Sequence, residues 1–460
     1  MLGNLIGPEI KELIDERNFT ALRSAFEAWA PADVAECITE LPANEQAVIF
    51  RILPHAQSTD VFEYLDSDAQ HVVLKAMGDV EAARILNDMS RDDRTALLEE
   101  LPGAAVQQMI QLLSPEEKKV ALSLLNYAED SVGRLMTPDF ISVRGEWTIQ
   151  QTLDYIREHG RDSETLNVIY VTSDHGRLID DLRIREILVR PVVMKIDEIR
   201  DNAFVSLRAN DDQKTALELF RKYDRTSLPV VDSEEKLLGI VTVDDMLDVQ
   251  EEEATEDIQR LGGMEALDEP YMTIALWRMI KKRASWLIIL FLGEMLTATA
   301  MQKYEDDIEK AAVLAIFLPL IISSGGNAGS QATTLIIRAM AVGEVRLRDW
   351  WRIMRKEISS GFFLGLILGT VGFMRILLWQ ALHIFNYGPH FLLIASTVGL
   401  ALVGVVLWGS VAGAMLPFLL RKCGLDPATS SAPFVATLVD VTGLLIYFNV
   451  ALLILRGTML

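Results

Sequence analysis

The sequence is poor in the residues from which most catalytic and structural metal centres are built. Its 460 residues include two cysteines, Cys37 and Cys423, and six histidines that show no ligand spacing. These numbers argue against a disulfide framework and against a CxxC metal site. The sequence also lacks a Ser/His/Asp or Cys/His arrangement and a phosphate-binding glycine loop followed by lysine. We therefore do not expect an enzyme.

Basic residues are also scarce. The chain has 43 lysines and arginines against 65 aspartates and glutamates, which gives a formal net charge of −22. This balance argues against nucleic acid as a partner and favours cations as the natural counter-ligand. The charge is unevenly placed, because residues 1–280 are charged and soluble in character whereas residues 284–457 are apolar with short polar breaks.

The apolar part contains five stretches that are long enough to cross a bilayer as helices. They lie at residues 285–302, 312–337, 358–380, 391–420 and 433–455. Lysine and arginine gather before the first stretch, between the second and third, and between the fourth and fifth. Because cytoplasmic loops carry the excess of basic residues, we expect a multi-pass protein of the cell (inner) membrane, in contact with lipid. Its N-terminus is then cytoplasmic and its C-terminus lies outside.

Residues 1–130 contain a helical repeat. Four residue pairs recur every 24 positions, each before a helical stretch: Leu41-Pro42, Leu65-Asp66, Met89-Ser90 and Leu113-Ser114. Ser114 followed by Pro115 is typical of a helix start, and Ser67 with Gln70 has the spacing of a capping box. Short helical repeats bury their faces against neighbouring units, so we expect an α-helical superhelical domain that serves as a scaffold. A generic helical bundle would have the same core.

Residues 131–243 change to short β-branched runs that alternate with helical ones. The expected strands lie at residues 136–143, 166–171, 203–207, 227–232 and 238–242, and the expected helices begin after Thr148 and Asp212. Two copies of a β-α-β-β-α plan resemble a tandem pair of cystathionine-β-synthase (CBS) modules, an α/β fold. The first copy departs from this plan, because Asp180 and Asp181 stand where the second copy has Gly239 and Ile240.

Residues 244–280 join these modules to the apolar part. The segment 244–257 holds eight acidic residues and no basic residue, proline or glycine, so we expect one helix. On it Asp245, Asp248, Glu252 and Glu256 share a face, and Glu253 and Asp257 form a further like-charge pair. Such a pair destabilises a helix by about 0.2–0.5 kcal/mol. Divalent cations remove this repulsion because hard ions take carboxylate oxygens. A solvated acidic linker is the alternative.

Asp440 lies within the last apolar stretch. An ionised carboxylate there costs about 2.5–3.5 kcal/mol even on lenient insertion scales, so it faces water or a partner rather than lipid. No basic residue of the stretch stands near it, and we interpret Asp440 as a cation site. The alternative is a protonated or helix-paired structural aspartate. Glu294, in the first stretch, is a second acid at membrane depth, and the sequence does not decide whether it is hydrated or paired.

Small residues surround these acids in the sequence. Ala436 stands four residues before Asp440 and shares its helix face. The second stretch contains a run of small and polar residues at 323–334, which lipid tolerates only against protein or water. Gly325-Gly326 within it allows a local helix break, and a close packing face is the alternative. The glycines spaced by four in the third and fourth stretches, Gly361, Gly365, Gly369, Gly409 and Gly413, favour packing faces.

The whole chain resembles the MgtE family of magnesium channels. The resemblance rests on five segments: Pro319–Ile322, Gly325–Gln331, Ile337–Ala339, Glu253–Ile258 and Ala436–Gly443. It implies a homodimer whose pore is lined by the second and fifth stretches, with Asp440 and Ala436 at the pore. Where the family can place an asparagine eight residues before the pore aspartate, this chain has Ala432.

The resemblance also implies regulation by metal. Family members bind Mg²⁺ between their cytosolic domains, which closes the pore when internal Mg²⁺ is plentiful. The matching positions are Asp245, Asp248, Glu253, Glu256 and Asp257, with Asp92 and Asp93 of the N-terminal domain as facing ligands. Some relatives bind ATP in the CBS pair, and the irregular first copy leaves that open here.

We therefore expect four parts. They are a helical-repeat domain at 1–130, tandem CBS domains at 131–243, an acidic connecting (plug) helix and linker at 244–280, and a pore domain at 281–460. The expected function is a Mg²⁺-selective channel closed by cytosolic Mg²⁺, with other divalent cations unranked. One alternative is a secondary transporter that couples Mg²⁺ to Na⁺ or H⁺. Another is a metal sensor that does not transport.

Overall fold

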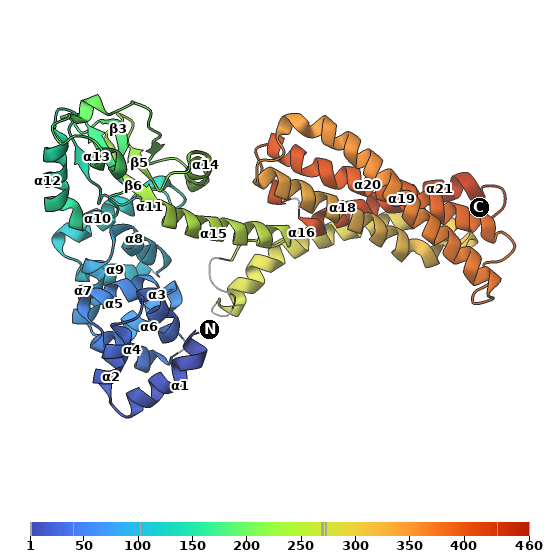
Figure 1. Ribbon diagram of the computed structural model, residues 1–460. Helices are drawn as coiled ribbons and strands as arrows, with labels where there is room; N and C mark the ends of the chain where they lie inside the picture. The colour runs from blue at the N-terminus through green and yellow to red at the C-terminus, as the bar shows by residue number, and fades with distance from the viewer. Residues whose placement is uncertain are drawn as a thin grey trace. The chain divides into compact units, whose positions relative to one another are not determined.

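The computed structural model describes the chain except for residues 1, 40, 102, 268–270, 272, 273, 430 and 460. It forms two compact units, Met1–Gln250 and Glu251–Leu460, and each is described by itself. The first unit holds helical and α/β parts, and the second holds long apolar helices (Figure 1).

The N-terminal part of the first unit is a stack of short helices. They are α1 (Leu2–Asp15), α2 (Phe19–Phe26), α3 (Pro31–Thr39), α4 (Ala43–Ile52), α5 (His55–Glu63), α6 (Ser67–Ala76), α7 (Asp79–Asp88), α8 (Arg91–Glu100), α9 (Gly103–Leu112) and α10 (Pro115–Leu124). Alternate helices pack together: α3, α5, α7 and α9 form one row, and α4, α6 and α8 form the other. This arrangement confirms the superhelical domain.

The 24-residue spacing marks the start of every second helix. Leu41, Leu65, Met89 and Leu113 are all buried in one core, and the residue after each stands directly before α4, α6, α8 or α10. The Ser114 hydroxyl accepts a hydrogen bond from Glu117 N at 3.3 Å, as expected. The capping box at Ser67 was wrong by one residue, because Asp66 is the N-cap of α6 and its Oδ1 accepts from Ala69 N at 2.8 Å.

The α/β part contains two three-stranded sheets of equal plan. The first sheet consists of β1 (Ser142–Val143), β2 (Val168–Thr172) and β3 (Leu178–Arg183), with helices α12 (Ile149–His159) and α13 (Ile184–Leu188). The short α11 (Val132–Leu135) precedes it and packs against β4 of the second sheet. The second consists of β4 (Leu207–Arg208), β5 (Ser227–Val231) and β6 (Leu237–Thr242), with α14 (Gln213–Tyr223). In each, the first pair of strands is parallel and the second is antiparallel. The repeated plan confirms the tandem modules.

The expected first strand was too long. Only its last two residues belong to β1, because Thr137 instead exchanges backbone hydrogen bonds with Ile240 of the other copy, both of 2.9 Å. Thr148 and Asp212 cap α12 and α14 as expected.

Asp180 and Asp181 have structural roles in the first copy. Asp180 is fully buried, and its Oδ2 accepts a hydrogen bond from Asn202 N at 2.9 Å. Asp181 forms an ion pair of 3.3 Å with Arg225, which belongs to the second copy. Burial raises the pKa of Asp181 to about 6, against the opposing effect of Arg225. At the position equivalent to Asp180, a Cβ on Gly239 would lie 2.7 Å from the carbonyl oxygen of Thr137, so the second copy has no room for a side chain.

The acidic segment forms one helix, α15 (Val243–Leu261), as expected. Beyond it, the second unit contains α16 (Leu276–Lys303), α18 (Leu318–Ala341), α19 (Trp350–Ala381), α20 (Phe391–Lys422) and α21 (Ala432–Leu455), with the short α17 (Glu305–Lys310) after α16. In the described residues five helical segments are long and apolar enough to cross a membrane, which confirms the five expected stretches. Helix α20 packs on α18, α19 and α21, and α16 packs on α21.

Glycines set the spacing of these helices, and the expected packing faces are confirmed. A Cβ on Gly365 of α19 would lie 2.8 Å from Val403 Cα of α20. On the opposite side of the bundle, a Cβ on Gly413 of α20 would overlap the carbonyl oxygen of Gly329 in α18. Helix α18 runs without interruption through Gly325-Gly326, so the break that this pair allows does not form.

Replacing Gly413 with alanine should destabilise the bundle, because the new methyl group meets backbone rather than a movable side chain. Overpacking of this kind costs about 1–3 kcal/mol. We expect a lower melting temperature for the detergent-solubilised protein. Gly404→Ala on the same helix is the matched control, since its Cβ would touch only Ile446 Cγ2 at 3.1 Å. Equal melting temperatures for the two variants would contradict this account of the packing.

Candidate functional site

Asp440 sits one third of the way along α21, where the start of the helix is fixed by polar contacts. Ser431 is the N-cap, and its Oγ also accepts a hydrogen bond from Trp286 Nε1 of α16 at 3.1 Å. Val435 and Val439 are fully buried, which places one face of α21 in the core of the bundle. Asp440 follows directly and is half-buried, at the border of that face.

Helix α18 approaches Asp440 through a glycine. A Cβ on Gly326 would lie 3.4 Å from Asp440 Oδ1 and 3.4 Å from Ala436 Cβ. One residue further along α18, Asn327 is exposed and its amide donates to the Ser323 hydroxyl at 3.4 Å. The structure therefore brings the two expected pore residues, Asp440 and Ala436, against the small and polar segment of α18.

The side chain in contact with Asp440 is another acid. The carboxyl groups of Asp440 and of Glu294 in α16 lie within hydrogen-bonding reach of each other. This contact brings no positive charge to Asp440, so it does not neutralise the carboxylate as a lysine or arginine would. Glu294 was recognisable in the sequence only as an acid at membrane depth. Its neighbour could not be predicted, because it depends on how α16 and α21 pack.

A second group of acids lies in the first unit. Asp92 and Asp93 stand in the first turn of α8, and Asp245 stands in the first turn of α15. Asp92 is only 7% exposed, and burial, followed by the charge of Asp93, raises its pKa to about 7. Burial and then the charge of Asp92 raise the pKa of Asp245 well above its usual range. The fold thus brings together Asp92, Asp93 and Asp245, as the sequence led us to expect.

Two further acids join this group and were missed in the sequence. Burial, together with the charges of Asp93 and Asp92, raises the pKa of Glu63 at the end of α5 to about 7. Desolvation and then the charges of Asp92 and other acids raise the pKa of Glu164, in the loop before β2, to about 8. Neither stands in a motif, so only the tertiary fold reveals them. We call Glu63, Asp92, Asp93, Glu164 and Asp245 the first-unit acid cluster.

Local hydrogen bonds hold the cluster in place. Ser90 donates its backbone N–H to Glu63 Oε1 at 2.8 Å and its hydroxyl to Asp93 Oδ2 at 2.7 Å. Asp245 Oδ2 accepts from the backbone N–H and the hydroxyl of Thr242, at 3.0 and 2.7 Å. Arg91 of α8 is engaged elsewhere, in ion pairs with Glu117 and Asp139.

These acids do not form a finished coordination shell. Across the described part of the chain, no group of three or more His, Cys, Asp or Glu side chains is arranged to hold a metal ion. The cluster is therefore a concentration of carboxyl groups rather than a preformed metal site.

The other expected ligands lie further along α15. Asp248 follows Asp245 by one helical turn, and Glu253, Glu256 and Asp257 belong to the second unit. Within that unit Glu256 forms an ion pair of 2.8 Å with Arg260, and Arg260 forms another of 2.7 Å with Asp426, in the loop between α20 and α21. The end of the acidic helix is thus tied to the loop that leads into α21.

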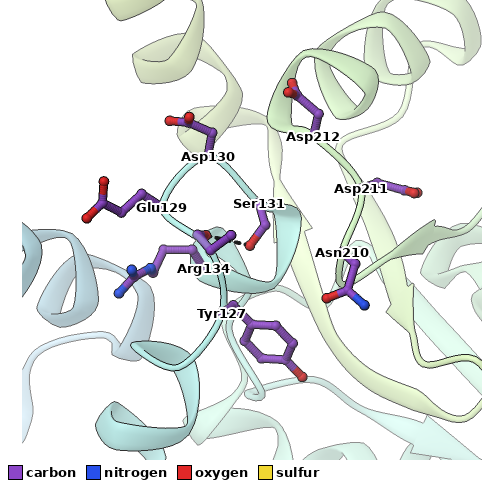
Figure 2. A pocket seen from close by; sticks show the side chains of 9 residues that line it. Tyr127, Glu129, Asp130, Ser131, Arg134, Asn210, Asp211 and Asp212 are labelled. Atoms are coloured by element: carbon purple, nitrogen blue, oxygen red, sulfur yellow. Dashed lines mark hydrogen bonds between the residues drawn. The ribbon is translucent and has the colours of Figure 1, made fainter.

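An open cavity of about 560 Å³ lies in the α/β part, between the segments 127–134 and 210–212 (Figure 2). Two of its acids stabilise local turns. Asp211 Oδ2 accepts from Arg208 N at 2.9 Å, and Asp212 Oδ1 accepts from Lys214 N at 2.8 Å at the start of α14. Asp211 therefore stabilises a turn, and Asp212 caps helix α14.

Comparison with known families matches three parts of the chain. Residues 318–450 match the MgtE profile, described as a divalent cation transporter. Residues 29–130 match the MgtE intracellular N domain, and residues 132–192 and 196–252 match CBS domains.

Curated relatives match almost the full length. The chain is 39% identical over 454 residues to the magnesium transporter MgtE of Thermus thermophilus, with 97% of this chain and 98% of that protein covered. It is 28% identical over 441 residues to the magnesium transporter MgtE of Bacillus subtilis, with 95% of each covered. Among solved structures, the cytosolic domain of the Mg²⁺ channel MgtE in complex with ATP is 34% identical, with a TM-score of 0.50. That match covers 52% of this chain and 98% of that structure.

The raised pKa values of the cluster predict a pH-dependent stability. Asp92 and Glu63 titrate near pH 7 when folded and near pH 4 when unfolded, so their protonated forms stabilise the fold at low pH. Without divalent cations, stability should fall as pH rises from about 4 to 7. Millimolar Mg²⁺ should raise the melting temperature by a few degrees at pH 8 and by much less at pH 5.5.

Asp92→Asn should reduce both the pH dependence of the stability and the effect of Mg²⁺ on the melting temperature. Thermal unfolding of the full-length protein measures both. Glu158→Gln, on the exposed face of α12, is the control and should behave as wild type. A Mg²⁺ effect of equal size at both pH values would show that the cluster does not bind the ion.

Proposed function

The chain belongs to the MgtE family of magnesium transporters, and on that premise we propose that it is a Mg²⁺-selective channel of the cell (inner) membrane, closed by cytosolic Mg²⁺. The observation that carries the proposal is the position of Asp440. It lies on a membrane-spanning helix against Gly326 and Ala436, and its contact is an acid rather than a base.

In the proposed pore, Asp440 attracts the cation and the small residues around it leave space. Magnesium releases its waters reluctantly, so it passes as a hydrated ion that is held through water. Gly326 and Ala436 keep bulky side chains away from the Asp440 carboxylate. Two chains related by a twofold axis would place two Asp440 carboxylates around one path, which is why we propose a homodimer.

The first-unit acid cluster supplies the proposed gate, and we propose that it lies on the cytosolic side. Two carboxylates about 4 Å apart repel by about 4 kcal/mol at an effective dielectric constant near 20. Mg²⁺ bound among Asp92, Asp93 and Asp245 removes this repulsion and holds the helical domain on the CBS pair. When cytosolic Mg²⁺ falls, the bare carboxylates repel and the two parts separate. A few such pairs exceed a switching difference of a few kcal/mol.

Helix α15 transmits the change. It begins with the ligand Asp245 in the first unit, and it ends at Arg260, whose ion pair with Asp426 reaches the loop before α21. We propose that Asp248, Glu253, Glu256 and Asp257 bind further Mg²⁺ along this helix and so hold it in the closed state. The function proposed here does not require ATP, the ligand of the similar cytosolic domain.

A secondary transporter that exchanges Mg²⁺ for Na⁺ or H⁺ is the alternative, with Asp440 as the coupling site. Single-channel currents separate the two, because alternating access is too slow to carry a resolved unitary current.

Asp440→Asn should reduce Mg²⁺ current at least about tenfold, because the amide lacks the charge that attracts the ion. The measurement is patch recording of the full-length protein in liposomes. Asn449→Asp on the same helix is the matched control for a charge change and should not restore current in the Asp440→Asn background. Wild-type current through Asp440→Asn would contradict the proposed pore.

A step of cytosolic-side Mg²⁺ from zero to millimolar should close the wild-type channel. Asp92→Asn with Asp245→Asn should reduce the difference in open probability between the two conditions, because the cluster then loses two ligands. Glu158→Gln should leave the difference intact. Open probability that ignores the step in the wild type would remove the gate from the proposal, though not the pore.

A further inference from the structure

Glu294 is a second carboxyl group at membrane depth, and the proposed function has not yet used it. It stands on α16, eleven residues after Arg283 and nine before Lys303. At a rise of 1.5 Å per residue it is therefore about 14–17 Å from either charged end of the helix. Its side chain is exposed in the single chain. A charged group so placed faces water or another protein surface rather than lipid.

The packing of α16 on α21 brings Glu294 to Asp440. A Cβ on Gly293 would lie 2.6 Å from Thr437 Cγ2, so the glycine allows the two helices to approach closely. The next residue is Glu294, whose carboxyl group contacts that of Asp440. Oxygen atoms from two different helices are thus available to one ion.

Thr297 adds an independent observation on the same helix face. It stands four residues after Gly293 and so also faces α21. Its side chain is only 9% exposed, and its Oγ has no hydrogen-bond partner among the described residues.

Six other threonines in the membrane helices satisfy this hydroxyl within their own helix, and Thr333 of α18 donates to Gly413 O of α20 at 2.7 Å. The carbonyl oxygen four residues earlier accepts from the Oγ of Thr299, Thr334, Thr370, Thr397, Thr437 and Thr442, at 2.8 to 3.1 Å. A buried hydroxyl that does not donate to the carbonyl oxygen four residues earlier is available to bind a ligand.

We propose that Glu294 and Thr297 make α16 a third pore-lining element, which binds the waters of a divalent cation beside Asp440. The inference rests on the proposed channel function and adds ligands to it. Carboxylate and hydroxyl oxygens accept hydrogen bonds from metal-bound water. In a homodimer the site then has four carboxylates rather than two, which favours a divalent over a monovalent cation.

Glu294→Gln tests the charge at nearly constant volume. We expect the Mg²⁺ concentration for half-maximal influx into proteoliposomes to rise about tenfold, because a nearby charge is lost. The permeability ratio of Mg²⁺ to Na⁺ should fall with it. Glu294→Asp should keep most of the wild-type selectivity. A merely structural role would lower the amount of folded protein without changing the half-saturating concentration, so size exclusion and melting accompany each assay.

Thr297→Val tests the hydroxyl and should move the half-saturating concentration in the same direction by about two- to threefold, as expected for one lost hydrogen bond. Thr299→Val is its matched control, since the Thr299 hydroxyl already donates to Met295 O at 3.1 Å. We expect wild-type values for this control.

Two results would overturn the inference. One is a Glu294→Gln protein with wild-type half-saturation and selectivity. If that variant fails to fold, wild-type values in both Glu294→Asp and Thr297→Val have the same meaning. A failure of the proposed channel function gives a different result, because an Asp440→Asn protein would then conduct like wild type. Loss of current in Asp440→Asn with no effect of Glu294→Gln leaves the pore standing and removes only the third element.

Discussion

A carboxylate that is taken out of bulk water has to be given a partner, and this requirement governs both parts of the molecule. In the membrane helices Asp440 is half-buried and meets a second acid, Glu294. In the first-unit acid cluster Asp92 is almost fully buried, beside Asp93 and near Asp245. Fixed basic side chains would satisfy the same requirement permanently. Where acids gather instead, carboxylate chemistry favours a hard cation such as Mg²⁺ as the partner.

The acids are held in place by helix packing that tolerates little change. Gly413 and Gly329 let the backbones of α20 and α18 approach closely, and Gly326, one turn before Gly329, then faces Asp440. Close contact between small residues is the main source of helix association in lipid, where burial of apolar side chains contributes little. The same small residues therefore serve two ends: they hold the bundle together, and they leave unfilled space beside the carboxylate.

Sequence reasoning succeeded where the signal is local or periodic. Apolar length defined the five membrane helices, and the 24-residue spacing of Leu41 and its equivalents defined the stacked helices. The same spacing would have corrected the cap of α6, since Asp66, not Ser67, continues the series that ends at Ser114. Glu63 and Glu164 could not be found in this way. Burial raises their pKa values, and the charge of Asp92, which is far from both in sequence, raises them further; no local pattern encodes that burial or that contact.

Helix α15 shows why stability alone does not explain the acids. A surface helix with so many like charges is weaker than a mixed one, since each pair at four-residue spacing costs about 0.2–0.5 kcal/mol. Arg260 offsets part of this repulsion through Glu256, but it also reaches Asp426 and so ties the helix to the loop before α21. The like-charge pairs run along most of the helix, and the ion pairs of Arg260 lie at its C-terminal end. A helix built in this way is restrained at its C-terminal end, next to the loop before α21, while its acidic residues extend back into the first unit.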